Sequence, residues 1–511
     1  MKGIHMARFN RPSAQTSRTV NLAGGEAFIE SPKLELVTHV LNSFVQDQYY
    51  RTGQEGLAEL RKVCDAIKDK EFLAQLAVFA RQHYGMRSIS HVLACEVAAS
   101  IEAKGTFWLR PFFYHVIRRV DDITEILSYW KAEKGGPYPN AMKRGLADAF
   151  SKFNGYQLAK YRSEGKGIGL RDAANYLHPR PVDRNRDALK GLIDGSLVSE
   201  DTWETMMTRA GQEGTEKGGV WRSLLREEKM PYFALLRNLR NIIRDAPDVE
   251  TVGLACAVLT NEKMLRQSLV LPFRFIAAYE AVHDVAVSGR ESVVAQKRLL
   301  DAIADAIDLS LGNLPELPGD TCIVFDCSAS MGDGFTSNKG KATLFAAAVA
   351  KKNPSSDVMA FGTDARYLVA DTSASIMNLV TRQLSGNHGV DHGTNFHAIF
   401  EAADKRSVAY DRFVIFSDMQ GWVGYENPTA TFNAYCQSVG KRPKVFCIDL
   451  AGYGTMMFPE RDVYTLAGWS EKIFDLLLAL EQDRAAQISM IERVDVRRGT
   501  VPGMSPNRDE A

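Results

Sequence analysis

The sequence has no apolar run long enough to cross a membrane, and it has few cysteines. None of its uninterrupted apolar stretches approaches the roughly 20 residues that a bilayer-spanning helix needs. Residues 1–20 carry basic side chains but no following apolar segment, which argues against a secretory signal. The seven cysteines are odd in number and scattered through apolar patterns, as reduced thiols are. We therefore expect a cytoplasmic protein with a flexible first segment and neither a disulfide framework nor a zinc module.

The chain also has no net charge, although its two parts differ in sign. The whole sequence of 511 residues carries 62 Lys and Arg against 62 Asp and Glu. Residues 1–310 carry 43 basic against 38 acidic side chains, and residues 311–511 carry 19 against 24. A chain of this length exceeds what one hydrophobic core usually serves, so we expect at least two domains. The first part suits an anionic partner and the second suits a cation.

The first three-fifths of the chain show the apolar spacing of helices and almost no strand-like alternation. Gly and Pro interrupt the pattern at modest intervals, so the helices should be short. Apolar residues recur every three or four positions in three sets: Leu57, Leu60, Cys64 and Ile67; Phe72, Leu76 and Phe79; and Phe112, Val116, Val120, Ile123 and Leu127. Many short helices in series predict stacked helical hairpins of the HEAT kind.

The last two-fifths alternate short apolar runs with helical segments. The runs at 321–325, 358–362, 412–416 and 444–450 are typical of buried parallel strands, and residues 341–352 and 471–482 have the pattern of helices. Alternating strands and helices predict a doubly wound α/β sheet.

Oxygen-bearing side chains follow two of these strands and occupy a loop between them. They are Asp326, Ser328, Ser330, Thr394 and Asp418. Ligands gather beyond the carboxyl ends of parallel strands, so these residues should meet there. Hydroxyls and carboxylates suit a hard cation such as Mg²⁺, with Ca²⁺ or Mn²⁺ as alternatives. The Asp-x-Ser-x-Ser pattern alone is weak evidence for a metal, because a capping turn has the same pattern. The whole set, however, resembles the metal-ion-dependent adhesion site of von Willebrand factor A domains.

Residues 151–190 form an unusually basic segment with interleaved aromatic and imidazole groups. Nine basic side chains stand against four acidic ones, and Tyr156, Tyr161, Tyr176 and His178 lie among them. Lys and Arg bind phosphates through charge, while Tyr and His can stack on or hydrogen-bond to unpaired bases. RNA is the anion we expect here. A solvated, charged connector between helices would show the same pattern.

Several stretches of the helical part resemble the TROVE module of Ro autoantigen proteins. They are NLAGGEAF, AKYRSEGKGIGLRDAANYLHPRP at 159–181, LKGLIDG, VSEDTWE and MPYFALLRNLRNI at 230–242. Together with the A-domain pattern, the chain resembles bacterial Ro proteins. The resemblance implies a flexible segment 1–20, a TROVE module 21–314 of HEAT-like repeats closed into a ring, an A domain 315–490 and a tail 491–511.

The same resemblance implies a function. A Ro protein binds Y RNA on its outer basic surface and takes single-stranded 3′ ends of misfolded or structured RNAs into the ring. It would act as a monomeric scaffold, without enzymatic activity, in a ribonucleoprotein for RNA quality control and stress survival. An exoribonuclease such as polynucleotide phosphorylase would be its partner.

Carried over by position, Lys160 and Arg162 match a basic pair around a Tyr, and His178 matches the family's His. One residue of length difference leaves Arg162 and Lys166 competing for one role. With their basic neighbours, the predicted RNA contacts are Lys160, Arg162, Lys166, Arg171, His178 and Arg180.

Two other functions compete with this prediction. A Mg²⁺-dependent nuclease would use the cation to activate water, with His388, His392 and His397 as possible ligands or bases. Such sites need more clustered carboxylates than Asp326 and Asp418 supply. A metal-dependent assembly factor would bind protein and no RNA. The near phosphate-loop match at 334–343 has wrong spacing and lacks the required Ser or Thr, so we discard nucleotide binding and predict no catalytic residue.

Overall fold

The computed structural model describes most of the chain. The described residues are 17–20, 26–29, 32–41, 53–161, 167–197, 203–268, 270, 272–335, 337–423, 428–451, 453, 457–458, 462–467, 477–478, 480–481 and 486–499. The helix predicted at 471–482 therefore lies mostly outside them. Among these residues, none of the helices combines the length and apolarity that crossing a membrane requires.

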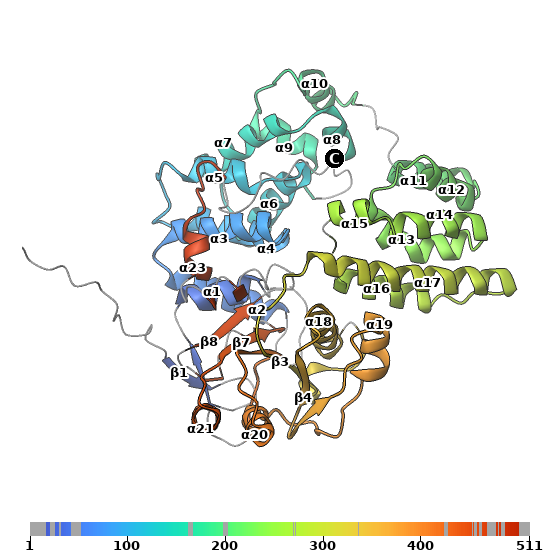
Figure 1. Ribbon diagram of the computed structural model, residues 1–511. Helices are drawn as coiled ribbons and strands as arrows, with labels where there is room; N and C mark the ends of the chain where they lie inside the picture. The colour runs from blue at the N-terminus through green and yellow to red at the C-terminus, as the bar shows by residue number, and fades with distance from the viewer. Residues whose placement is uncertain are drawn as a thin grey trace, which may run out of the picture. The chain divides into compact units, whose positions relative to one another are not determined.

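The first part of the chain is helical, as the apolar spacing predicted (Figure 1). Helices that follow one another pack as neighbours, for example α3 on α4, α13 on α14 and α16 on α17, which fits stacked hairpins. The helices are α1 (Pro32–Leu41), α2 (Gly53–Ala66), α3 (Lys70–His83), α4 (Ser88–Ala99), α5 (Leu109–Val116), α6 (Val120–Glu133), α7 (Asn140–Ala149), α8 (Gly155–Lys160), α9 (Leu170–Leu177), α10 (Arg186–Asp194), α11 (Trp203–Glu213), α12 (Lys217–Arg226), α13 (Tyr232–Asp245), α14 (Val249–Leu259), α15 (Glu262–Ser268), α16 (Pro272–His283) and α17 (Arg290–Ser310).

The second part carries a six-stranded sheet in the order β5-β4-β3-β6-β7-β8. Its strands are β3 (Thr321–Asp326), β4 (Asp357–Phe361), β5 (Ala365–Leu368), β6 (Arg412–Ser417), β7 (Lys444–Asp449) and β8 (Val463–Ala467). All neighbours run parallel except β5, which pairs antiparallel with β4 at one edge. The helices of this part are α18 (Asn338–Lys352), α19 (Ile376–Asn378), α20 (Phe396–Arg406), α21 (Thr429–Val439) and α23 (Ala486–Glu492). This confirms the predicted doubly wound sheet.

Both faces of the sheet are covered. On one face, α20 and α21 supply Phe400 and Tyr435 to a core with Val324 and Ile415 of the central strands. On the other, Phe345 of α18 stacks on Phe416 of β6, with ring centroids 5.7 Å apart. Because every residue of β3 and β6 is buried, both strands read as continuous apolar runs in the sequence.

The described elements group into two compact units, and the chain passes between them more than once. The sheet unit spans 316–372 and 380–469 and also takes residues 1–66, with the hairpin β1 (Ser17–Val20) and β2 (Glu26–Ile29) and with α1, which packs on β8. The helical unit spans 67–315, 373–379 and 470–511. Within it, α23 packs on α3, and the Gln75 side chain donates to the Glu492 carbonyl at 2.8 Å.

The apolar spacing from Phe112 to Leu127 runs across a break between two helices. The chain ends α5 at Val116 and starts α6 at Val120. The Asp122 carboxylate accepts the backbone N–H groups of both Arg118 and Arg119 at 2.9 Å, so it satisfies donors that α6 would otherwise leave unpaired. Capping by the Asp122 side chain therefore starts a new helix here, although the apolar spacing continues across the break.

Asp122 also forms the centre of a buried ionic cluster between α3, α4 and α6. Arg81 and Arg87 lie 3.2 and 2.9 Å from its carboxylate oxygens, and His91 Nε2 lies 3.2 Å away. Burial alone would raise the pKa of Asp122, but His91 and the two guanidinium groups hold that pKa well below its ordinary value. The buried negative charge is thus compensated by cations of the protein itself.

Candidate functional site

The predicted metal ligands begin at the last residue of β3. The Asp326 carboxylate is fully buried and accepts the Ser328 N–H at 2.7 Å and the Ser417 hydroxyl at 2.6 Å. The Ser328 and Ser330 hydroxyl oxygens lie 3.3 Å apart in the turn that follows, and both residues are buried. This turn therefore gathers one carboxylate and two hydroxyls at the carboxyl end of the sheet.

Asp418 follows the neighbouring strand β6 and faces the same turn. The Ser330 side chain lies close enough to lower the pKa of Asp418, and the Asp418 Oδ1 accepts the Gln420 N–H at 3.2 Å. Its Oδ2 is buried and has no hydrogen-bond partner among the described residues. An unpaired, buried carboxylate oxygen is costly unless a cation or water satisfies it.

Backbone hydrogen bonds bring the Thr394 loop to the same place. The Ala329 N–H donates to the His392 carbonyl at 3.1 Å, and the Trp422 N–H donates to the Thr394 carbonyl at 3.1 Å. The Asn395 N–H donates to the Gly362 carbonyl after β4 at 2.9 Å, and a Cβ on Gly362 would overlap the Asp391 carbonyl. Three segments far apart in the sequence therefore converge, as the strand-end argument predicted.

The charge balance of this cluster fits a bound cation. Burial, together with the neighbouring Asp418 charge, raises the pKa of Asp326, and burial raises the pKa of Asp418. No Lys, Arg or His of the described chain forms an ion pair with either carboxylate. Two buried carboxylates beside three buried hydroxyls, including that of Thr394, form an oxygen-only donor set of the kind that Mg²⁺ prefers.

The three loop histidines do not converge with these carboxylates. His388 Nε2 lies 3.1 Å from the Leu384 carbonyl, His392 Nδ1 lies 3.4 Å from the Asn387 amide, and His397 Nδ1 lies 2.7 Å from the Thr431 hydroxyl. Across the described residues, no group of three or more His, Cys, Asp or Glu side chains is placed to hold a metal ion. The arrangement offers few of the clustered carboxylates that a two-metal nuclease uses.

The predicted RNA contacts lie on α8, α9 and the turn after α9. Lys160 ends α8, with its Nζ 5.8 Å from the Tyr156 ring centroid and 5.5 Å from that of Tyr161. His178 caps α9 in a left-handed conformation (φ 52°) and is exposed, as is Arg180. Arg162 and Lys166 lie outside the described residues. The choice between these two stays a prediction.

Arg171 has a structural contact in addition to its predicted one. Its Nε donates to the Ile193 carbonyl near the end of α10 at 2.9 Å, so it satisfies an acceptor that the helix end leaves unpaired. The side chain nevertheless remains exposed to solvent. A substitution at Arg171 would therefore change both the local fold and the surface charge.

One basic residue near this surface was missed by the sequence reasoning. The Arg119 guanidinium lies 4.6 Å from the Tyr161 ring centroid and forms hydrogen bonds with Asp121 at 3.0 and 3.1 Å. Arg119 lies outside the basic segment 151–190 in sequence. No local spacing signal could have linked it to Tyr161, since only packing brings the two together.

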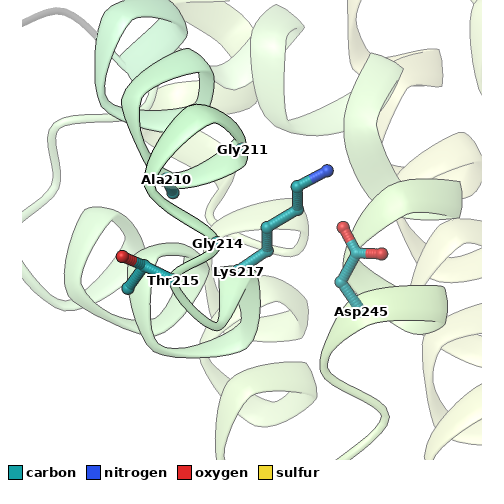
Figure 2. A pocket seen from close by; sticks show the side chains of 6 residues that line it. All are labelled: Ala210, Gly211, Gly214, Thr215, Lys217 and Asp245. Atoms are coloured by element: carbon teal, nitrogen blue, oxygen red, sulfur yellow. The ribbon is translucent and has the colours of Figure 1, made fainter.

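The structure also contains a small, open cavity among α11, α12 and α13, with a volume of about 330 Å³ (Figure 2). Lys217 and Asp245 carry charge on its wall, and Ala210, Gly211, Gly214 and Thr215 complete it. Asp245 is already paired, because the Arg244 Nε lies 2.8 Å from its Oδ1. None of the residues predicted from the sequence lines this cavity.

Each of the two parts of the chain matches a family model. The TROVE domain model matches residues 42–195 and 195–299, and the Ro60 vWA domain model matches residues 321–477. The two models therefore follow each other in the order that the sequence resemblance implied.

Individual relatives agree with this assignment. The chain is 25% identical to "RNA-binding protein RO60" of Deinococcus radiodurans over 361 residues, which cover 62% of this chain and 67% of that protein. It is 20% identical to "Telomerase protein component 1" of Rattus norvegicus, of which it covers only 13%. The crystal structure of the Deinococcus radiodurans RO (RSR) protein matches with a TM-score of 0.59 at 20% identity, covering 92% of this chain and 100% of that one, and so shares the fold.

Proposed function

Because the chain belongs to the TROVE-domain family and carries a Ro60 vWA domain, we propose that it is an RNA-binding protein that acts as a scaffold and not as an enzyme. The observation that carries this proposal is the match to both family models in one chain. The name of the Deinococcus relative, an RNA-binding protein, supports it.

The exposed positions of His178 and Arg180 support RNA binding at the turn after α9. Together with Lys160 and Arg171, they would contact phosphates and unpaired nucleotides. Basic side chains neutralise phosphates and release counterions, so affinity should fall steeply with salt. We propose that Y RNA binds here and that single-stranded 3′ ends of misfolded or structured RNAs are a second class of ligand.

The sheet unit would supply a protein-binding site through a divalent cation. Ser328, Ser330 and Thr394 would hold Mg²⁺ directly, and Asp326 and Asp418 mainly through water. Such a cation supplies one open coordination position for an acidic side chain of a partner. The buried carboxylates Asp326 and Asp418 support this part of the proposal, because a bound divalent cation would stabilise their negative charge.

The partner we propose is an exoribonuclease such as polynucleotide phosphorylase, in a cytoplasmic ribonucleoprotein that acts in RNA degradation and stress survival. In this division of roles the partner cuts RNA, whereas the present chain binds it. Among the described residues, two carboxylates converge at the candidate metal site, fewer than a two-metal nuclease uses, which favours recruitment over hydrolysis.

RNA affinity measured at two salt concentrations tests the RNA-binding part. The full chain should bind a structured RNA with a single-stranded 3′ end, and affinity should drop at least tenfold between 50 and 200 mM salt. Arg180→Ala should weaken binding and reduce the salt slope by about one. Lys263→Ala, an exposed lysine of α15, serves as the control and should change neither quantity.

Crosslinking the purified chain to RNA would locate the contact. Linked peptides should come mainly from residues 160–180. Binding that is indifferent to salt, or crosslinks confined to the sheet unit, would contradict the proposal and favour a protein-binding assembly factor instead.

A further inference from the structure

An exposed tyrosine lies near the end of α9, between Arg171 and His178 in sequence, which are both predicted RNA contacts. Tyr176, the last residue but one of α9, is 47% exposed. Helices α7 and α9 pack against each other within the helical unit, where Figure 1 labels them side by side. The ring therefore faces solvent from a rigid element and not from a loop.

A second aromatic ring fixes the orientation of Tyr176. Tyr138 precedes α7, and its ring meets that of Tyr176 at an interplanar angle of 64°, with centroids 5.3 Å apart. The Tyr138 hydroxyl donates to the Leu127 carbonyl of α6 at 3.2 Å, which anchors the supporting ring. Edge-to-face contact of this kind is favourable and supports the Tyr176 ring. Part of the Tyr176 ring nevertheless remains exposed to solvent.

A cation accompanies the ring. Lys143 of α7 places its Nζ 5.6 Å from the Tyr176 ring centroid. No carboxylate of the described chain forms an ion pair with Lys143, and the neighbouring Arg144 is exposed. The ring is thus bordered by positive charge that the protein does not neutralise.

We propose that Tyr176 is a stacking position for an unpaired base of single-stranded RNA and that Lys143 holds an adjacent phosphate. This inference rests on the proposed RNA-binding function and adds the chemistry of one contact. An aromatic face accepts any base, so the position would select unpaired over paired nucleotides without reading sequence.

The surroundings favour a nucleotide over a protein ligand. An aromatic anchor of a protein interface usually lies among apolar neighbours that exclude water. Here Arg171, His178 and Arg180, all exposed, lie close to Tyr176 in sequence. Positive charge around an open ring is the pattern of single-strand binding sites.

Fluorescence anisotropy with the full chain and three RNAs tests the inference. The probes are a single strand of about 12 nucleotides, the same strand with abasic riboses in its centre, and a blunt duplex. Tyr176→Ala should weaken binding of the intact strand about tenfold and leave the abasic strand unchanged. Tyr176→Phe should retain wild-type affinity, because it keeps the aromatic face.

Two further variants separate stacking from folding and from charge. Tyr176→Leu keeps an apolar contact with Tyr138 but removes the aromatic face, so it should behave like Tyr176→Ala. Lys143→Ala should weaken binding of both strands and lower the salt slope by about one. Phe107→Ala removes a 73% exposed ring elsewhere in the helical unit and should leave binding unchanged.

The outcomes distinguish this inference from the function on which it rests. If the wild-type chain binds none of the three RNAs at low salt, both fail. If it binds but Tyr176→Ala matches wild type, or loses affinity equally for the intact and abasic strands, the stacking position is refuted while RNA binding stands. If Tyr176→Leu retains wild-type affinity, the ring serves only packing, and the inference is likewise overturned.

Discussion

The two units of this molecule both bury carboxylates, and they compensate the charge in opposite ways. In the helical unit, Asp122 is surrounded by Arg81, Arg87 and His91, and its pKa is held low. In the sheet unit, Asp326 and Asp418 are buried among hydroxyls, and their pKa values are raised. A buried carboxylate that is paired with cations of the protein contributes to the fold. A buried carboxylate without such a partner favours the binding of an external cation.

The largest expected effect is the loss of the compensated carboxylate. Asp122→Ala would leave the buried Arg81 guanidinium and the partly buried Arg87 guanidinium without their common partner, so it should cost about 3–5 kcal/mol of unfolding free energy. Urea denaturation in EDTA and in excess Mg²⁺ measures this, and the loss should be the same in both. Asp148→Ala removes an exposed pair with Arg110 and should cost less than about 1 kcal/mol. Equal losses in the two variants would contradict the contrast between the units.

The opposite change in unfolding free energy is expected when one of the uncompensated carboxylates, Asp326 or Asp418, loses its charge. Asp418→Asn removes a buried charge and keeps an oxygen that can accept the Gln420 N–H, so in EDTA it should raise the unfolding free energy by roughly 1–3 kcal/mol. The same variant should lose the stabilisation that wild type gains from Mg²⁺, which grows with free metal concentration. RNA affinity should stay close to normal.

The matched control for that variant is Asp333→Asn, whose side chain is 96% exposed in the following loop. It should keep the full response to Mg²⁺. If Asp418→Asn is destabilised in EDTA, or still gains as much from Mg²⁺ as wild type, the site is not a cation site. Joint loss of metal response and RNA binding would show that the two units do not work independently.

A smaller effect is expected from the loop that carries Thr394. Gly362→Ala would push a Cβ into the Asp391 carbonyl and displace the loop while leaving every proposed ligand in the sequence. Mg²⁺ affinity, measured by calorimetry, should fall about tenfold, as it does when residues that orient the ligands of a metal site are changed. Gly219→Ala adds a Cβ that meets no atom within 4 Å and should leave the affinity unchanged. An unaltered affinity in Gly362→Ala would mean that Thr394 is not a ligand.

The smallest expected effect is a pH dependence of the helical unit. Burial lowers the pKa of His91, but Asp122 and Glu125 more than offset this and raise it above its ordinary value. A raised histidine pKa stabilises the fold fully below about pH 6.5, and this contribution is lost as pH rises through the folded-state value. Wild type in EDTA should therefore lose more unfolding free energy than His91→Gln between pH 6 and pH 8.5. If the urea midpoint changes equally between the two pH values in wild type and in His91→Gln, this prediction is refuted.

The sequence predicted the parts of the fold that depend on local pattern. β3 and β6 are buried on both faces, so their apolar runs were visible, and the polar residues after them marked the sheet edge where Asp326 and Asp418 meet. β5 and β8 were not predicted. β5 is short, lies at an edge and is only partly buried, so its sequence Ala-Arg-Tyr-Leu shows no strand pattern.

What the sequence could not predict depends on contacts between distant residues. The ionic cluster joins Asp122 to Arg81 and Arg87, which lie on or near other helices. The contact of Arg119 with Tyr161 and that of Lys143 with Tyr176 are equally invisible to spacing rules. The metal and RNA assignments themselves stay predictions until ligands are measured.

The repeated passage of the chain between its two units limits how the protein can be dissected. A fragment ending near residue 314 would lose α23, which packs on α3, and would keep α1 without its partner strand β8. Each such truncation exposes apolar surface that the full chain covers, so aggregation of a fragment would say nothing about the role of the deleted part. Point substitutions in the full-length chain are therefore the sound way to assign tasks to either half.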